Sequence, residues 1–185
     1  MAMTALRDMT SADKDKVRLW RNLPEVSKYM YTDHAISPEE HAAWFNRISS
    51  DPSCKYWIVV CDGEDVGVAW IFDIDQRNLR CYWGFYLGSA NVRGKGVGRV
   101  AEYSVLRYVF DELKLNKLCG EVLGFNQAVM NMHMGFGFVQ EGYFRKHVLK
   151  NGVMQDIFCI GMLQEEWEAR KPEIESRLRA KGLIS

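Results

Sequence analysis

A glycine-rich, basic segment at residues 87–99 is the part of the sequence best suited to chemistry. Glycine lets the backbone turn tightly and approach a ligand closely, and the first turn of a helix presents unpaired N–H groups to an anion. Because the segment lies between a predicted strand and a predicted helix, it predicts a site for phosphate or pyrophosphate. The residues that would form this site are Arg93, Gly94, Lys95, Gly96, Val97, Gly98 and Arg99.

Two common nucleotide-binding motifs do not fit this spacing. A P-loop requires Ser or Thr directly after Gly-Lys, whereas Lys95 is followed by Gly96. A dinucleotide-binding fold requires G-x-G-x-x-G at the first turn of a parallel βαβ unit, but this segment follows strands joined by short hairpin turns. A glycine-rich surface turn with incidental basic residues is the alternative that the segment alone leaves open.

The segment resembles the pyrophosphate loop of the GCN5-related N-acetyltransferases. Residues 93–98 match the family's R/Q-x-x-G-x-G/A motif, which holds the pyrophosphate of acetyl-CoA, and Gly137-Phe138 matches a later part of the family. The resemblance implies an α/β acyltransferase fold, in which helices flank a mixed, mostly antiparallel sheet. It also implies one domain over residues 1–185, with a core at about 4–165 and a closing helix at about 164–182. Acetyl-CoA would be the co-substrate, and no metal would be needed.

The family likeness implies further contacts with acetyl-CoA. The strand before the loop would pair with the pantetheine arm and polarise the thioester carbonyl through backbone N–H groups, with Phe85, Tyr86 and Leu87 nearest. A neighbouring strand at 117–123 would splay away and open the cleft where the thioester meets the amine. Asn126 would bond the pantetheine arm, and the alternative that it caps the following helix is compatible with that role.

Acetyl transfer to an amine needs one group that accepts the amine proton and another that protonates the departing thiolate. Glu121 on strand 117–123 is the candidate base, although a glutamate that merely faces solvent is the alternative, because strand faces alternate. His133 is the candidate acid, and it stands where the family commonly carries a tyrosine, seven residues after the asparagine. Tyr143 is the substitute acid. A histidine hydrogen-bonded against the sheet is the alternative for His133.

An aromatic and amide cluster near the start of the chain indicates the acceptor side. Arg21, Asn22, Tyr29, Met30 and Tyr31 stand in sequence contexts that resemble the branch of the family active in pseudaminic-acid biosynthesis. That branch acetylates the 4-amino group of a UDP-linked amino-dideoxy sugar, a precursor of the sugar that decorates bacterial flagellin. Ordinary packing of the first helices on the sheet is the alternative for Tyr29 and Met30.

Two other functions compete with a nucleotide-sugar acetyltransferase. An N-terminal protein acetyltransferase is suggested because residues 141–145, Asn151-Gly152 and Asp156 match the tail of the ribosomal-protein branch. A CoA-binding regulatory module with an inert site is a candidate of another class. The presence of both Glu121 and Asn126 argues against that module.

The composition favours a folded protein that binds a small ligand. The chain has 185 residues, 48% of them apolar, and its 24 basic and 24 acidic side chains cancel. A neutral balance argues against a nucleic-acid or acidic-membrane partner. No apolar run approaches the ~20 residues of a membrane span, and the start lacks a signal-peptide core, so a cytoplasmic location is expected. The expected partner is a small nucleotide sugar, and a homodimer is compatible with the sequence.

The cysteines and histidines suggest neither a metal site nor a covalent intermediate. The five cysteines are far apart and odd in number, which predicts small buried hydrophobic residues in a reducing compartment. No Cys-x-x-Cys pair or His-x-x-x-His motif is present, so no metal ligand cluster is predicted. Because no cysteine stands beside a histidine in sequence, we expect direct attack of the amine without an acyl-enzyme. His34 and His41 are expected at exposed positions.

Hydrophobic periodicity and turn signals predict the elements that would position these residues. Two helices come first, one after Thr10-Ser11 and one starting at Ser37-Pro38, where Ser37 suits the cap and proline the first turn. The remaining elements are predicted as strands 56–61, 66–74 and 79–87, a helix within 97–109, a strand at 117–123, a helix at 128–134, strands 138–144 and 153–163, and a charged closing helix.

Overall fold

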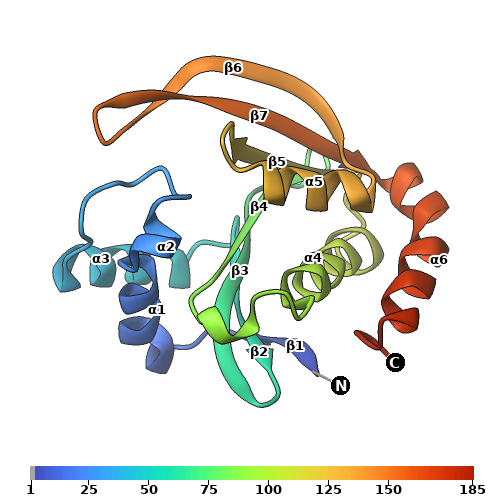
Figure 1. The fold of residues 1–185 in the computed structure, drawn as a ribbon, viewed down its shortest axis with the longest axis horizontal. Coiled ribbons are helices and arrows are strands. Elements are labelled where there is room, and N and C mark those ends of the chain that lie inside the picture. Colours follow the sequence, from blue (N-terminus) through green and yellow to red (C-terminus); the bar gives the residue numbers. More distant parts are fainter. Residues whose placement is uncertain (1–2) are drawn as a thin grey trace.

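Seven strands form one mixed sheet in the computed structural model, which describes residues 3–185 (Figure 1). The strand order is β1-β2-β3-β4-β5-β7-β6, and only β4 and β5 run parallel. That pair is joined by a helical crossover, as parallel neighbours require. The strands are β1 (Thr4–Asp8), β2 (Lys55–Cys61), β3 (Glu64–Asp75), β4 (Arg80–Leu87), β5 (Lys117–Leu123), β6 (Val139–Lys150) and β7 (Val153–Leu163).

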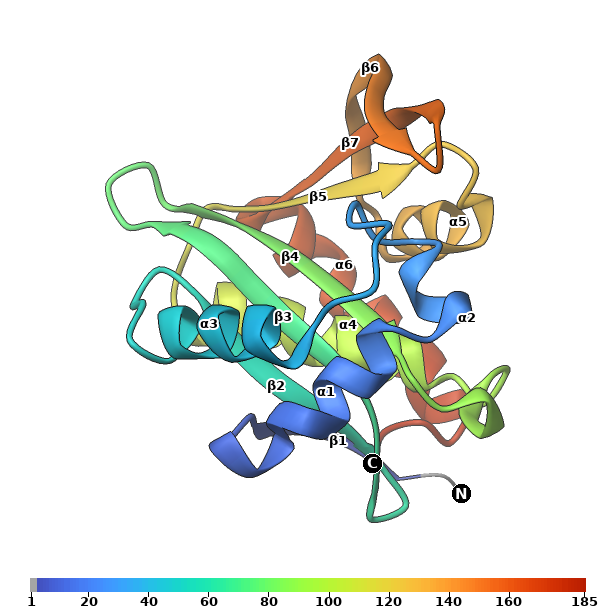
Figure 2. The same ribbon diagram turned by 90° about the vertical axis from the view of Figure 1, so that its left-hand side faces the viewer.

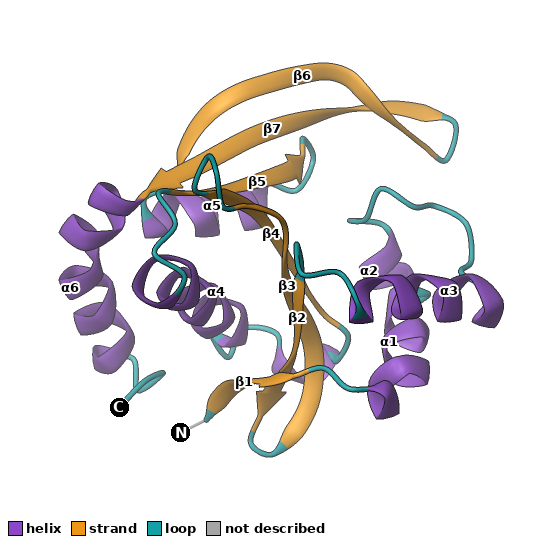
Figure 3. Cartoon of the chain, turned by 180° about the vertical axis from the view of Figure 1, so that it is seen from behind, coloured by secondary structure: helices purple, strands orange, loops and turns teal. Residues whose placement is uncertain are grey.

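Helices cover both faces of the sheet. The first three lie on one side of β2–β4 and α4 lies on the other, as Figures 1 and 3 show from opposite sides. A π-helical turn at Tyr108–Glu112 extends α4 before the chain enters β5. The helices are α1 (Lys14–Arg21), α2 (Pro24–Ser27), α3 (Pro38–Ser49), α4 (Val97–Arg107), α5 (Gln127–Phe136) and α6 (Gln164–Ala180).

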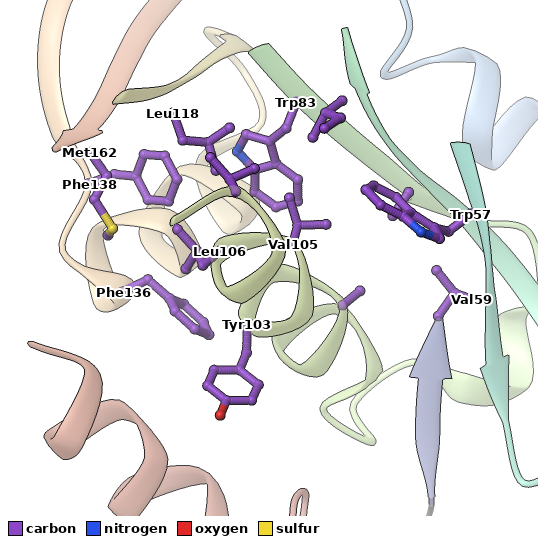
Figure 4. Packing of buried hydrophobic residues seen from close by; sticks show 14 of the residues in the cluster. Trp57, Val59, Trp83, Tyr103, Val105, Leu106, Leu118, Phe136, Phe138 and Met162 are labelled. Atoms are coloured by element: carbon purple, nitrogen blue, oxygen red, sulfur yellow. The ribbon is translucent and has the colours of Figure 1, made fainter. Parts of the chain in front are cut away.

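The two helical layers bury separate hydrophobic clusters. Trp57 and Val59 on β2 point into the larger cluster around α4, whereas Ile58 between them points into the smaller cluster beneath α1–α3 (Figure 4). Successive strand side chains point to opposite faces, so a strand covered on both faces reads as a continuous apolar run. This two-sided burial explains why residues 57–59 lack the alternation of a half-exposed strand.

Most predicted elements are confirmed, and two short ones were missed. Strands 117–123 and 153–163 have the predicted bounds, and Ser37 caps α3 by accepting a hydrogen bond from the Glu40 N–H at 3.1 Å. The strand predicted at 138–144 is longer, because β6 continues to Lys150 alongside β7. The sequence analysis contained neither β1 nor the four-residue α2. β1 has a single large aliphatic side chain, Leu6, and depends on its pairing with β2.

The parallel pair β4–β5 is joined over only three residue pairs. Residues 80–82 pair with residues 117–119, and from there β5 diverges from β4 (Figure 2). β4 stays paired with β3 as far as Leu87, while β5 pairs with β7 along its whole length. The predicted splay of strand 117–123 is therefore confirmed, and the edge of β4 that faces β5 is unpaired beyond Tyr82.

A cluster of charges fixes the start of the chain to the sheet. The buried carboxylate of Asp13 accepts hydrogen bonds from both terminal nitrogens of Arg7, at 2.8 and 2.6 Å, and from the Thr10 N–H at 2.9 Å. Arg7 also bonds Asp65 at the end of the β2–β3 hairpin. The bond from Arg7 lowers the pKa of Asp13 far below its ordinary value.

Replacing Asp13 with Asn should destabilise the protein by about 2 kcal/mol, because the arginine loses charge-assisted hydrogen bonds. A carboxylate with a depressed pKa in the folded state stabilises it above the unfolded-state pKa, and that contribution disappears as the pH falls through the folded-state value. The difference between wild type and Asp13→Asn in urea unfolding should therefore be full at pH 7 and shrink below about pH 4. Asp15→Asn, at an exposed position on α1, is the control. Equal stability of Asp13→Asn and wild type at pH 7 would contradict this account.

Candidate active site

The glycine-rich segment begins α4 in backbone conformations that favour glycine. Gly94 and Gly96 have φ angles of +77° and +81°, and Gly96 is the N-terminal cap of the helix. A Cβ atom on Gly98 would lie 3.2 Å from the Phe85 ring, so a side chain there would press on β4. The Arg99 N–H donates to the Gly96 carbonyl oxygen at 3.0 Å, so the N–H groups of Val97 and Gly98 are the first-turn donors left for the predicted pyrophosphate.

A groove of about 470 Å³ runs past this loop. The end of β4, the loop and α5 form its walls, α2 contributes Glu25 and Val26, and the segment after α2 contributes Tyr29 and Met30. The predicted CoA-binding residues that line it are Phe85, Tyr86, Leu87, Arg93, Gly94, Gly96, Val97, Gly98, Arg99 and Asn126. Lys95 is the one predicted loop residue whose position is outside the lining.

Asn126 stands at the N-terminal cap of α5, as the alternative interpretation stated. Its side chain makes no capping hydrogen bond, however, and it lines the groove as well as the neighbouring cleft. The amide of Asn126 is thus available to a ligand at the junction of the two spaces.

A cleft of about 280 Å³ continues from the groove into the gap between β4 and β5. It brings together Glu121 from β5, His133 from α5 and the backbone of Gly84-Phe85 on the unpaired edge of β4. Residues from the first 31 positions close the other side, namely Arg21, Tyr29, Met30 and Tyr31. Side chains more than 100 positions apart in the sequence therefore meet where the strands separate.

Glu121 is exposed at the cleft and is held by a tyrosine. The Tyr31 hydroxyl donates a hydrogen bond to the Glu121 carboxylate. Burial, reinforced by this bond, raises the pKa of Tyr31 well above its ordinary value, so the hydroxyl stays a donor. The bond leaves the other carboxylate oxygen of Glu121 available to an amine in the cleft.

His133 is buried and engaged on one side only. Its Nδ1 lies 2.8 Å from Oε1 of Glu102 on α4, and its ring packs edge-on against Trp83 at a centroid distance of 5.1 Å. The sequence analysis did not single out Glu102. The signal that could have found it is a glutamate beside Ala101 on the apolar face of a predicted helix.

Tyr143 lies apart from this cleft. It is 46% exposed on β6, donates a hydrogen bond to Asp156 and packs against Phe158. Tyr143 is not among the residues that line the groove or the cleft. This position places His133, and not Tyr143, beside Glu121.

A third space, the acceptor pocket, adjoins the cleft through Arg21, Met30, Thr32 and Trp70. Its volume is about 470 Å³, and its other lining residues are Ile36, Glu40, His41, Ala43, Trp44, Arg47, Tyr56, Val68 and Tyr86. The sequence analysis expected His41 to be exposed, and this was wrong. α3 packs its ring beneath Trp44 at a centroid distance of 4.7 Å, and His41 is buried.

The loop that carries Tyr29–Thr32 is fixed from two directions. Asn22 does not line the pocket, because its amide bonds the backbone of Ile36 at 2.8 and 2.9 Å. From the other side, the Nζ of Lys150 donates to the carbonyl oxygens of Ser27 at 3.0 Å and Met30 at 2.8 Å. The tip of the β6–β7 hairpin is therefore attached to this loop, and no local sequence signal predicts that contact.

The cysteine thiols are poorly suited to a covalent intermediate. All five are free, and burial raises the pKa of four of them, to about 12 for Cys81. A thiol with a raised pKa is seldom a thiolate at neutral pH and is a weak nucleophile. Direct attack by the amine remains the predicted route.

Two kinds of feature are missing from residues 3–185. No group of three or more His, Cys, Asp or Glu in that range could hold a metal ion. No helix of the described chain is both long and apolar enough to cross a membrane.

Comparison with known proteins identifies the class. A family model described as an acetyltransferase (GNAT) domain matches residues 4–139. The chain therefore belongs to the GNAT family and is an acetyl-CoA-dependent N-acetyltransferase.

Individual relatives share this class. Acetyltransferase PseH of Campylobacter jejuni is 29% identical over 134 residues, which cover 71% of this chain and 82% of the relative. The SPbeta prophage-derived uncharacterized N-acetyltransferase YokL of Bacillus subtilis is 32% identical over 126 residues, covering 68% and 70%. A solved structure of spermidine N-acetyltransferase from Vibrio cholerae with CoA and spermine superposes with a TM-score of 0.84. It is 21% identical and covers 90% of this chain and 98% of that one, a likeness that concerns the fold.

Filling the groove at the loop should weaken CoA binding. Gly98→Leu would direct its side chain toward Phe85 and Met132, and we expect the Kd for CoA in calorimetry to rise at least about tenfold. Gly135→Ala is the matched control, because a Cβ there meets nothing within 4 Å. A folded Gly98→Leu protein with unchanged affinity would overturn the loop assignment.

Removing the carboxylate in the cleft should slow the chemistry more than binding. Glu121→Gln is expected to lower kcat roughly a hundredfold, with the Kd for acetyl-CoA little changed. The loss should shrink at high pH, where the amine is already neutral and depends less on a base. Glu141→Gln, on β6 beside Lys117, is the control for loss of a carboxylate outside the cleft. Full activity of Glu121→Gln across the pH range would remove Glu121 as the base.

Proposed function

We propose that this enzyme acetylates the 4-amino group of a UDP-linked amino-dideoxy sugar, as in pseudaminic-acid biosynthesis. The likeness to acetyltransferase PseH supports this acceptor, and so do the Arg21-Asn22 and Tyr29–Tyr31 contexts. The observation that carries the proposal is the acceptor pocket, where an arginine without a carboxylate partner stands among aromatic rings.

Arg21 gives this pocket a place for an anion. It lines both the pocket and the cleft and has no ion-pair partner among residues 3–185. Burial lowers the pKa of its guanidinium, which is the mark of a cation deprived of water. A diphosphate would compensate that loss by a bidentate, charge-assisted pair. Arg47 is a second cation on the pocket lining. The carboxylate on that lining, Glu40, is hydrogen-bonded to His34 instead.

The aromatic walls suit a flat base. Tyr56 and Trp70 are stacked at a centroid distance of 6.1 Å, and Trp44 meets the Tyr56 ring edge-on at 5.4 Å. The Tyr86 hydroxyl and both ring nitrogens of His41 are buried without a hydrogen-bond partner. Buried polar atoms without partners are costly, and the carbonyl and N–H groups of uracil would satisfy them.

The reaction follows from the arrangement of the cleft. Acetyl-CoA supplies the acetyl group, with its pyrophosphate at the start of α4 and its thioester beside the unpaired edge of β4. Backbone N–H groups there would stabilise the charge that develops on the carbonyl oxygen. Glu121 would accept the proton of the attacking amine, and His133 would protonate the departing thiolate.

An N-terminal protein acetyltransferase is the main rival. A protein N-terminus would need a cleft that admits an extended chain. Lys150 joins the β6–β7 hairpin to the carbonyls of Ser27 and Met30, and Met30 lines both the cleft and the pocket. A loop held in place beside an aromatic pocket favours a small ligand.

Replacing the pocket arginine should affect the nucleotide sugar alone. Arg21→Ala is expected to raise the KM for the UDP-linked amino sugar by about tenfold to a hundredfold, because one charge-assisted contact with phosphate is lost. The Kd for acetyl-CoA should be unchanged, and Arg77→Ala, in the exposed β3–β4 turn, is the control.

Three acceptors distinguish these functions in an assay that follows release of the CoA thiol. The UDP-linked amino sugar should be turned over faster than the free amino sugar or a peptide starting with Ala or Ser. Equal turnover of the free and UDP-linked sugars would remove the nucleotide from the account. Faster acetylation of the peptide would favour the protein-modifying rival.

A further inference from the structure

A fully buried carboxylate supports His133 from behind. Glu102 on α4 is 0% exposed, its Oε1 lies 2.8 Å from His133 Nδ1, and its Oε2 has no partner. The histidine is itself only 5% exposed, yet it lines the cleft beside Glu121. A buried carboxylate with only one hydrogen-bond partner destabilises the folded protein, so a functional role would explain why the pair is present.

We propose that Glu102 is a positioning residue that keeps a proton on Nε2 of His133, so that the histidine can donate it to the departing CoA thiolate. The inference rests on acetyl transfer from acetyl-CoA and is independent of which amine accepts the acetyl group.

The hydrogen bond restricts where the protons can be. If Glu102 is protonated, its O–H donates to Nδ1, and the neutral ring then carries its own proton on Nε2. If Glu102 is ionised and the ring is cationic, both ring nitrogens carry protons. Nε2 is therefore a donor in either neutral form of the pair, and it makes no hydrogen bond to residues 3–185.

The proton transfer balances within the pair. The Nε2–H bond breaks as the S–H bond of CoA forms, and the proton shared between Oε1 and Nδ1 ends on Nδ1. The negative charge then rests on the Glu102 carboxylate, and no imidazolate forms. The amine proton goes to Glu121 and then to solvent, and a proton from solvent restores the pair.

The surroundings control how firmly the pair holds its proton. Burial raises the pKa of Glu102, which makes the proton shared by the pair harder to lose. His133, and Arg99 on α4 beside Glu102, lower that pKa. The other titratable groups that line the cleft with His133 are Arg21, Tyr29, Tyr31 and Glu121. Trp83, Phe85 and Phe138 surround the ring with apolar surface. An isolated imidazole would already be mostly neutral at pH 8, whereas the pair would still have an acidic proton to give.

The test is the pH profile of Glu102→Gln, an isosteric change that keeps a hydrogen bond to Nδ1. At pH 8 we expect kcat to fall roughly a hundredfold, since donation from a neutral ring would leave an imidazolate. At pH 6 the loss should be much smaller, because protonated imidazole can donate a proton without leaving an imidazolate, and it is more abundant at lower pH. The Kd for CoA should stay within about twofold of wild type. A merely structural role for Glu102 would not produce an unchanged Kd together with this pH dependence of kcat.

A double variant checks that Glu102 acts through the histidine. Glu102→Gln combined with His133→Asn should be no slower than His133→Asn alone, because coupled residues are not additive. Full activity of Glu102→Gln, a loss that is the same at every pH, or additive losses would each overturn the proposal.

The wild-type protein provides a readout that needs neither folding of a variant nor a known acceptor. In a ¹⁵N NMR spectrum at pH 8, Nε2 of His133 should be protonated. A bare Nε2 would overturn the proposal even if acetyl transfer to the sugar were established. If Nε2 is protonated but the sugar is not acetylated, the role of the Glu102–His133 pair stands and only the proposed acceptor is wrong.

Discussion

Parallel pairing between β4 and β5 ends after three residue pairs, and the active site depends on that break. In a continuous sheet the edge of β4 beyond Tyr82 would be hydrogen-bonded to β5, and no backbone N–H group would face a ligand. Here β5 turns away with β7 as its partner, so a cleft opens that has a polar edge on one wall and Glu121 on the other. The crossover between these strands carries α4, whose glycine-rich start lies at the mouth of the same opening. One topological feature thus brings the proposed anion site and the proposed reacting groups together.

Among residues 3–185, four of the five buried side-chain polar atoms without partners lie on the acceptor pocket or next to His133. The larger cluster beneath α4 is almost wholly apolar, and Glu102 is the charged side chain buried in it next to His133. On the other face, the smaller cluster borders the acceptor pocket, where the Tyr86 hydroxyl and the His41 ring have no partner. Such groups weaken the free protein, and a ligand that satisfies them gains affinity and orientation. A ligand in the pocket would satisfy the Tyr86 and His41 atoms, whereas Oε2 of Glu102 is buried behind His133.

Local signals predicted much of the fold and the CoA side of the site. The glycine loop, the cap at Ser37 and the strand 117–123 all depend on neighbouring residues, and they were located from glycine and basic spacing, a Ser-Pro-Glu-Glu capping signal and a short apolar run. What the sequence could not provide depends on contacts between distant segments. β1 forms because β2 offers an edge, His41 is buried because α3 lies on the sheet, and Lys150 reaches carbonyls about 120 positions away. Glu102 belongs to this group, since its partner is 31 positions further along the chain.

The unpaired edge of β4 as the thioester site is the central claim, and amide hydrogen exchange tests it most directly. In the free protein, amides at residues 83–87 that face the gap should exchange quickly, whereas those at 80–82, paired with β5, should be protected. Saturation with acetyl-CoA should slow exchange at 83–87 and leave 80–82 unchanged. Binding of acetyl-CoA without added protection at residues 83–87 would contradict the account.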